Sequence, residues 1–239
     1  MSDTLVIIPT YNERESLAAL LGRVRQTVPA ADVLIVDDSS PDGTGELADQ
    51  LAESDHAVAV IHRASKDGLG RAYLAGFRHG IDRGYRFIVE IDADGSHDPA
   101  ELPAMLALAR DGADLVLGSR WVAGGSVLNW PWPRQAISRM GNAYARAVLG
   151  SSIRDLTSGF RVFHTEALTA LDFGSVASQG YCFQIELAWL MERRGFVVAE
   201  HPITFVERAV GRSKMHSGIV IEALARVTVW GLTKRRRNA

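Results

Sequence analysis

Short apolar runs alternate with amphipathic segments along the first half of the chain. The segments 4–10 (TLVIIPT), 32–37 (DVLIVD) and 57–61 (AVAVI) are apolar enough to be strands that are buried on both faces. Between the first two, apolar residues follow helical spacing at Leu17, Leu20, Leu21, Val24 and Val28. This alternation predicts an α/β fold with a mostly parallel central sheet that is flanked by helices.

The alternation continues to residue 119 and then gives way to a different composition. Further strands are expected at 85–92 and 113–119, and helices at 43–53, at 69–82 and around Leu102, Met105, Leu106 and Ala109. The loop GGSVLNWPWPRQ is followed by an expected helix from Gln135 to Leu149. No linker composition or repeat marks a second domain. We therefore expect residues 1–239 to form one domain, with an elaboration at about 120–150 and a C-terminal amphipathic helix at about 217–233.

Composition narrows the class of protein. Hydrophobic residues make up 47% and charged residues 23% of the 239 positions, which is typical of a soluble globular protein. The net charge of -2 gives no support for nucleic acid as a partner. A single cysteine, Cys182, excludes an internal disulfide and is expected to be a buried thiol in a reducing, cytoplasmic compartment. No secretory signal is recognised, and no apolar stretch reaches the roughly 18 residues of a membrane span.

Acidic residues gather where expected strands end. Asp37 and Asp38 close one strand, and Asp92 and Asp94 follow another, separated by the small Ala93. Asp98 has a simpler explanation, because Asp-Pro-Ala-Glu is typical of a helix start. In parallel α/β sheets, ligands bind beyond the carboxyl ends of the strands, so these acids are expected to share one site.

The chemistry of Asp92 and Asp94 favours a divalent metal. If the chain is still extended there, both carboxylates lean to one side, and carboxylate oxygens suit Mg²⁺ or Mn²⁺. Such ions also take phosphate oxygens or water, so a metal-bound diphosphate ligand is a natural hypothesis. An Asp-x-Asp pair alone is nevertheless a weak signal.

A set of motifs in a fixed order strengthens this hypothesis. They are IPTYNE (8–13), VDDSSPDGTG (36–45), KDGLGRAYLAGF (66–77), DADGSHDP (92–99), GSRW (118–121), DLTSGFRVF (155–163), GYCFQIE (180–186) and PITFVERAVGRSKM (202–215). Together they resemble glycosyltransferase family 2 with the GT-A fold, and specifically its polyprenol (dolichol) phosphate mannose synthases. The resemblance implies GDP-mannose as donor, a polyprenyl phosphate as acceptor, inversion at the anomeric carbon and work at the cytoplasmic face of a membrane.

The resemblance also implies roles for individual residues. Asp92, Ala93 and Asp94 would contact the donor, with Asp92, Asp94 and Ser96 at the metal; relatives often carry Gln where this chain has Ser96. The remaining nucleotide-sugar contacts would be Pro9, Tyr11, Glu13, Asp37, Asp38, Arg208 and Lys214. The acceptor phosphate would meet Arg120, Arg134 and Ser138 in the elaboration, and the catalytic residues would be Asp94, Arg120 and Arg134.

Simpler interpretations of several residues stay open. Glu13 pairs with Thr10 as a capping box, and Asp37 and Asp38 precede a turn. His97 is expected to be a structural or solvent-exposed residue and not a metal ligand. Arg134 is also typical of a solvated helix start. The C-terminal helix suits burial in protein or in lipid, where Trp230 and the basic run 234–237 would contact the headgroups.

Alternative functions also stay open. The same fold and acceptor could be used with another sugar nucleotide, such as UDP-glucose. A processive polysaccharide synthase would usually show Q-x-x-R-W and several membrane spans, which this sequence lacks. A phospho-receiver module would leave residues from about 125 onward unexplained, and a silent binding subunit would not need intact motifs.

Overall fold

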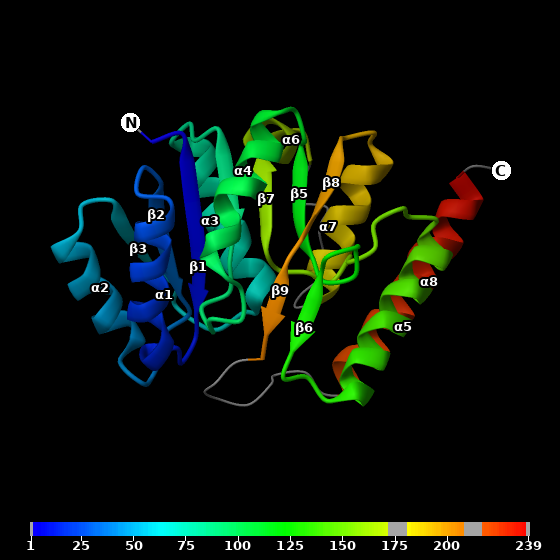
Figure 1. The fold of residues 1–239 in the computed structure, drawn as a ribbon, viewed down its shortest axis with the longest axis horizontal. Coiled ribbons are helices and arrows are strands. Elements are labelled where there is room, and N and C mark those ends of the chain that lie inside the picture. The colour runs from blue at the N-terminus through cyan, green and yellow to red at the C-terminus, as the bar shows by residue number, and fades with distance from the viewer. Residues whose placement is uncertain (1, 172–180, 208–216, 238–239) are drawn as a thin grey trace.

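The computed structural model describes residues 2–171, 181–207 and 217–237 (Figure 1). Its centre is a seven-stranded sheet with the order β3-β2-β1-β4-β7-β5-β8. The strands are β1 (Thr4–Thr10), β2 (Asp32–Asp37), β3 (Val58–His62), β4 (Phe87–Glu90), β5 (Leu115–Ser119), β7 (Arg161–His164) and β8 (Val198–Pro202). All pair in parallel except β7, which is antiparallel to both of its neighbours. The predicted α/β fold with a mostly parallel sheet is confirmed.

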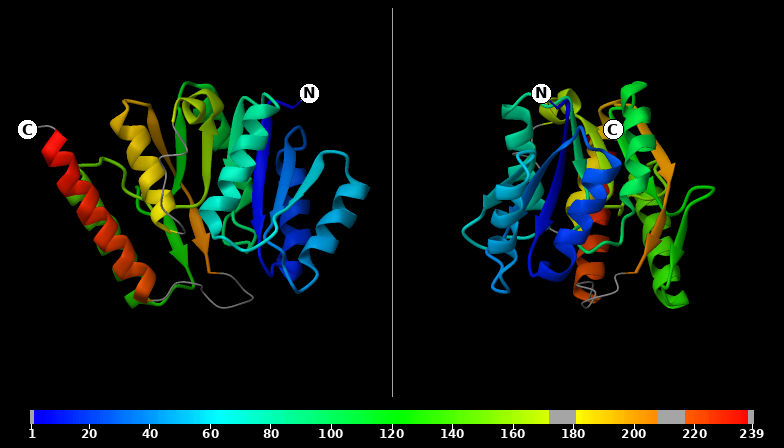
Figure 2. Two further views of the ribbon diagram at one scale, coloured as in Figure 1. Left: turned by 180° about the vertical axis from the view of Figure 1, so that it is seen from behind. Right: turned by 60° about the vertical axis from the view of Figure 1, so that its left-hand side comes forward.

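Helices cover both faces of the sheet. One face packs against α1 (Arg14–Thr27), α2 (Thr44–Ser54) and α4 (Leu102–Arg110), which follows the 3₁₀ turn Pro99–Glu101. The other packs against α3 (Leu69–Asp82), α6 (Thr165–Ala170) and α7 (Tyr181–Arg193), as the view from behind shows (Figure 2). Along β1, Leu5 and Ile7 join one core while Val6 and Ile8 join the other. Burial on both faces explains why this strand is apolar throughout.

Two helices lie side by side beyond β8, α5 (Trp132–Leu149) and α8 (Ser217–Arg237) (Figures 1 and 2). A Cβ on Gly231 would come within 2.5 Å of Val148 Cγ1, so this glycine permits the close approach of the two helices. Tyr144 Oη and Thr228 Oγ1 share a hydrogen bond of 2.6 Å across the same contact. The described helices include none that is long and apolar enough to span a membrane.

The C-terminal helix packs on protein along one side. Val227 is buried, and the Trp230 ring stacks on Trp189 with 6.0 Å between centroids. Trp230, expected as an anchor in lipid, is therefore partly buried against α7. The helix continues through the basic run 234–237, but those side chains lie outside the described residues.

Some element boundaries differ from the prediction. The helix expected from Gln135 begins at Trp132, and the loop before it contains β6 (Ser126–Leu128), which pairs with β9 (Thr204–Val206). The expected strand 85–92 is shorter and ends at Glu90. Asp98 caps the turn that begins at Pro99, as the sequence predicted.

The direction of β7 determines what lies next to the ends of β4 and β5. Because β7 is antiparallel to both, its first residue, Arg161, pairs with Glu90 of β4 and Leu117 of β5. The segment 154–160, which precedes β7, is therefore delivered to the edge where β4 and β5 end.

Candidate active site

A cavity of about 140 Å³ lies at this edge and extends between α5 and α8. The residues that reach it from the sheet edge and the nearby loops are mostly polar: Asp92, Asp94, Ser96, His97, Arg120, Trp130, Thr157, Gly159, Phe205 and Glu207. Those from α5, α7 and α8 are mostly apolar: Arg134, Ile137, Ser138, Gly141, Tyr144, Ala145, Ile185, Ala223, Leu224 and Val227. The cavity thus joins a charged region to an apolar one.

Asp92 and Asp94 both line the cavity, although not from an extended strand. The expectation of extended backbone here was wrong, because the strand ends at Glu90 and a turn follows in which Gly95 has a φ of 73°. Asp92 accepts a hydrogen bond from Tyr73 Oη (3.2 Å), and Asp94 accepts one from the backbone N–H of Ser96 (3.0 Å). The two carboxylates therefore reach one cavity because of this turn, and not because alternate residues of a strand point to the same side.

The donor set fits a divalent ion that is bound largely by its substrate. Within residues 2–171, 181–207 and 217–237, no group of three or more His, Cys, Asp and Glu side chains is suited to a metal. Asp92 and Asp94 offer two carboxylates, and Mg²⁺ typically takes one or two of these plus substrate phosphates and water. A Cβ on Gly159 would lie 3.2 Å from Asp92 Oδ2, so glycine here permits close approach to that carboxylate.

His97 is buried among aromatic rings beside the acids, so of the two alternatives the structural one holds and the solvent-exposed one does not. Its ring stacks on Phe160 with 5.1 Å between centroids and meets Phe205 edge-on at 5.2 Å. Burial lowers the pKa of His97 to about 4, so the imidazole is neutral near pH 7.

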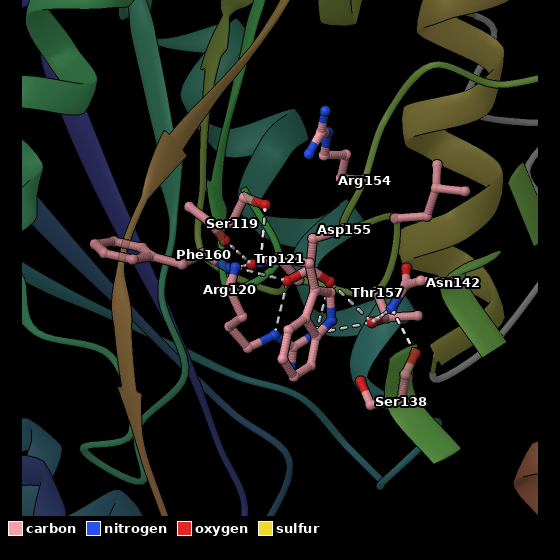
Figure 3. Close-up of polar contacts among 12 residues, drawn as sticks. Ser119, Arg120, Trp121, Ser138, Asn142, Arg154, Asp155, Thr157 and Phe160 are labelled. Carbon is pink, nitrogen blue, oxygen red and sulfur yellow. Dashed lines mark hydrogen bonds and ion pairs between the residues drawn. The ribbon is translucent and has the colours of Figure 1, made fainter. Parts of the chain in front are cut away.

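Arg120 is held by a buried carboxylate (Figure 3). Its Nε and Nη2 each donate to Asp155 at 2.7 Å, and its backbone N–H donates to the same side chain at 3.0 Å. Burial alone would raise the pKa of Asp155, but Arg120 and the hydrogen bonds to this carboxylate keep that pKa below its ordinary value. The Arg120 charge at the cavity is consequently matched by a charge of opposite sign.

A hydroxyl connects this pair to α5 (Figure 3). Thr157 Oγ1 donates to Asp155 and accepts from Arg120 Nη2 (2.8 Å) and Asn142 Nδ2 (3.1 Å). Asn142 Nδ2 also donates to the carbonyl of Ser138. Ser138, an expected acceptor contact, lines the cavity from α5. The hydrogen bonds through Thr157 and Asn142 connect that helix to Arg120. Asp155 and Thr157 belong to the DLTSGFRVF motif and Asn142 to the expected helix 135–149, but none of the three was predicted as a site residue.

Arg134 occupies the first turn of α5 beside an aromatic ring and an acid. Its guanidinium carbon lies 4.2 Å from the centroid of the Trp130 ring, and its Nη1 donates to Glu207 Oε1 in a short ion pair. The structure thus places Arg134 at the cavity, and not in open solvent. Glu207 belongs to the PITFVERAVGRSKM motif but was missed as a site residue.

The remaining expected donor contacts lie where β1 and β2 end. Asp38 pairs with Arg63; burial raises the pKa of Asp38, and Arg63 opposes that rise. Asp37 accepts hydrogen bonds from Thr10 Oγ1 (2.8 Å) and Ser40 Oγ (2.6 Å), so its carboxylate holds the loop together.

The expected capping box between Thr10 and Glu13 is not formed. Thr10 donates to Asp37, and Glu13 is itself the N-cap of α1, with its backbone N–H donating to Thr44 Oγ1 (3.0 Å). Pro9 is the last residue but one of β1, and Lys66 Nζ lies 3.7 Å from the centroid of the Tyr11 ring. Arg208 and Lys214 lie outside the described residues.

A buried arginine, Arg161 of β7, lies next to a buried carboxyl group, Glu90 of β4. Arg161 Nε is 3.9 Å from Glu90 Oε2, and neither side chain is exposed. Arg161 also donates to the carbonyls of Leu156 and Ser158, which fixes the segment before β7. Burial raises the pKa of Glu90 to about 8.

Cys182 is a buried free thiol, as predicted.

Comparison with known proteins begins with sequence. The family model for glycosyl transferase family 2 matches residues 5–171. A polyprenol monophosphomannose synthase from Mycolicibacterium smegmatis is 53% identical over 99% of this chain and 89% of its own length. An undecaprenyl-phosphate mannosyltransferase from Micrococcus luteus is 53% identical over 97% of this chain and 95% of its own.

Solved structures share the fold at lower identity. A mannosyltransferase from Pyrobaculum calidifontis, in complex with GDP-Man and Mn²⁺, is 18% identical with a TM-score of 0.64, over 99% of this chain and 65% of its own. The glucosyl-3-phosphoglycerate synthase from Mycobacterium tuberculosis, with Mn²⁺ and UDP-glucose, is 21% identical with a TM-score of 0.66, over 97% and 78%. At these identities the likeness shows the fold alone.

Proposed function

The chain belongs to glycosyl transferase family 2, and from this premise we propose that it transfers mannose from GDP-mannose to a polyprenyl phosphate, giving polyprenyl phosphomannose. One observation carries the proposal: a single cavity joins Asp92 and Asp94 to Arg134 and then to the apolar sides of α5 and α8. An acceptor with an anionic head and an isoprenoid tail fits this arrangement, with the head at Arg134 and the tail along the apolar residues of α5 and α8. The names of the two relatives that are 53% identical support the same acceptor and sugar.

The donor is assigned to the side of the cavity with the acids. Asp92 and Asp94 would hold a Mg²⁺ or Mn²⁺ ion, assisted by Ser96, with Ala93 against the sugar nucleotide. The ion would neutralise the charge that develops on the leaving diphosphate. Pro9, Tyr11, Glu13, Asp37 and Asp38 are proposed around the nucleotide, and Arg208 and Lys214 at the diphosphate.

The acceptor phosphate is assigned to Arg134 and Ser138 on α5, with Arg120 beside them. Guanidinium groups suit phosphate because they donate in a planar fork. An acceptor phosphate oxygen attacks the anomeric carbon as the bond to the diphosphate breaks, and GDP leaves with that electron pair. Because the phosphate is already an anion, it needs positioning more than a general base. In-line attack inverts the anomeric centre, so GDP-α-mannose gives a β-linked product.

Docking on a membrane surface would bring the enzyme to its lipid acceptor. On α5, Trp132, Met140 and Ile137 are 78%, 70% and 53% exposed. Further exposed apolar residues on neighbouring elements are Leu128, Val229 and Leu232. We place this surface against the cytoplasmic face of the membrane. The buried free thiol of Cys182 suits the reducing compartment on that side.

The second candidate uses the same acceptor with UDP-glucose. The fold favours neither donor, because its solved neighbours were captured with GDP-Man and with UDP-glucose. We would incubate the protein with radiolabelled GDP-mannose or UDP-glucose, undecaprenyl phosphate and Mn²⁺, and identify the lipid product by mass spectrometry and NMR. Mannosyl transfer with a β linkage is expected, and it should be lost in Asp94→Ala. Glucosyl transfer alone, or no lipid product, would overturn the proposal.

A further inference from the structure

Both arginines at the described lining of the cavity already have a carboxylate partner. Arg120 pairs with Asp155, and Arg134 pairs with Glu207. A phosphate that approaches Arg134 therefore meets an ion pair. An entering anion must share the guanidinium with the acid or displace it.

The two acids differ in how readily they can be displaced. The Asp155 side chain is fully buried and accepts three hydrogen bonds from Arg120, so its departure would leave a buried charge without a partner. The Glu207 side chain is 30% exposed. Water can therefore solvate the Glu207 carboxylate after it leaves Arg134, whereas Asp155 has no such alternative.

The backbone N–H groups of Val206 and Glu207 are hydrogen-bonded, while the Glu207 side chain lines the cavity. The Glu207 N–H donates to the carbonyl of Leu128 (3.1 Å), and the Val206 N–H donates to that of Ser96 (3.1 Å). The Arg134 guanidinium also lies over the Trp130 ring, a contact that does not depend on Glu207. The Glu207 carboxylate can thus leave Arg134 by rotation of its side chain, without movement of its own backbone N–H contact.

We propose that Glu207 is an internal competitor for the acceptor phosphate: its carboxylate occupies Arg134 in the empty site, yields to the phosphate and recaptures Arg134 as the product leaves. The inference rests on the proposed assignment of the acceptor phosphate to Arg134. It gives Glu207 a defined effect on the reaction, because any anion that binds at Arg134 must first break the Arg134–Glu207 pair, which lowers the affinity for that anion.

The reaction itself changes the charge in favour of Glu207. A phosphate monoester carries about −1.5 to −2 near pH 7, whereas the diester formed by transfer carries one negative charge. The new bond joins the acceptor oxygen to the anomeric carbon, and the charge lost by the acceptor appears on the departing GDP. The product therefore holds Arg134 less strongly than the substrate did, and the carboxylate can return.

The test uses Glu207→Gln with a short-chain, detergent-soluble polyprenyl phosphate. Removal of the competing carboxylate should lower both the KM for acceptor and the inhibition constant of the corresponding polyprenyl phosphomannose by about three- to fivefold, the scale of a partly exposed ion pair. Slower product release should lower kcat. The apparent KM for the sugar nucleotide should stay near that of the wild type.

Two further variants separate the pairing from general effects. Glu222→Gln is the matched control, because it removes the same charge from an exposed Glu–Arg pair on α8, outside the cavity lining; it should leave both constants unchanged. Glu207→Asp keeps the charge but shortens the reach, so it should give most of the Gln effect. Thermal unfolding would confirm that each variant is folded.

The outcomes distinguish this inference from the proposed function. Absence of lipid product in the wild-type protein would remove the proposed function. If the wild type forms product but Glu207→Gln binds acceptor and product equally or more weakly, Glu207 is a support for Arg134, and the competitor inference is overturned alone. If Glu222→Gln changed the acceptor KM and the product inhibition constant by the same factors, the effect would be one of net charge, and the competitor inference would be overturned.

Discussion

Asp155 is fully buried opposite Arg120, and this pair shows how one residue can stabilise both the fold and the site. Removing one partner of a buried ion pair leaves an uncompensated charge and typically costs about 3–5 kcal/mol. Asp155 also accepts from Thr157, and so connects the pair to α5. Replacement of Asp155 is therefore expected to lower the free energy of unfolding as well as the activity.

Asp155→Asn should lower the free energy of unfolding near pH 7 by about 3–5 kcal/mol. Because the pKa of Asp155 is held below its ordinary value, its contribution is present above the pKa of the unfolded state and is lost as pH falls through the lower folded value. The difference from wild type should thus shrink in strong acid. Urea unfolding at a series of pH values measures this, with the exposed Asp49→Asn as control. Equal stabilities at neutral pH would contradict the assignment.

At the scale of elements, the exposed side of α5 is the proposed contact with lipid. Trp132 and Met140 are exposed and are not among the residues that line the cavity, so they can be changed without altering it. Burial of each large apolar side chain contributes about 1.5–3 kcal/mol.

Trp132→Ala with Met140→Ser should therefore weaken binding to anionic liposomes at least about tenfold, while activity on a short soluble acceptor is kept. Flotation of the protein with liposomes measures the first effect. Leu108→Ser on α4, another exposed apolar position, serves as control. A second variant with Ser at 234–237 tests the basic run separately, which would contribute roughly 1 kcal/mol per residue. Flotation of the α5 variant at the wild-type level would exclude this surface as the anchor.

The sequence predicted the first half of the fold better than the second. The helix over 69–82 was located to the residue, because its apolar spacing is regular and its neighbours are strands. β7 was missed because it is only four residues long and includes Arg161, which is charged yet fully buried. β8 was missed because its five residues, VAEHP, are each only partly buried and do not form an apolar run.

The same limit applies to the site. The acids at the strand ends were expected to share one site, because the carboxyl ends of parallel strands share an edge. Asp92 and Asp94 do line one cavity, whereas Asp37 and Asp38 are not among its lining residues. The partners of Arg120 and Arg134 could not be read from the sequence, since Asp155 lies 35 positions away and Glu207 lies 73 positions away. Such pairs follow from the tertiary fold and leave no local pattern.

For the whole molecule, a site with two carboxylates predicts that metal and nucleotide bind together. Mn²⁺ alone should raise the Tm only slightly, because the protein supplies few ligands, whereas GDP with Mn²⁺ should raise it more. A ligand at 100 times its Kd adds about 2.7 kcal/mol of stability.

Thermal unfolding with each ligand alone and with both measures this coupling. Asp94→Ala should abolish the extra stabilisation while retaining the Tm of the ligand-free protein. EDTA should remove transferase activity, and Mn²⁺ or Mg²⁺ should restore it. Full turnover in chelator, or equal stabilisation by GDP with and without Mn²⁺, would contradict the metal assignment.

The position of β7 also determines the order in which the sheet can close during synthesis. In the described sheet β7 joins β4 to β5, with Phe87 opposite His164 and Leu115 opposite Phe163. A nascent chain that has not yet reached residue 161 can pair β1 to β4, which leaves one edge of β4 unpaired; β5 then has no partner on either side, because β8 follows later still. Such edges readily pair with other chains. We therefore expect the chain to be exposed to aggregation until this short central strand is inserted, after about two thirds of the chain has been made.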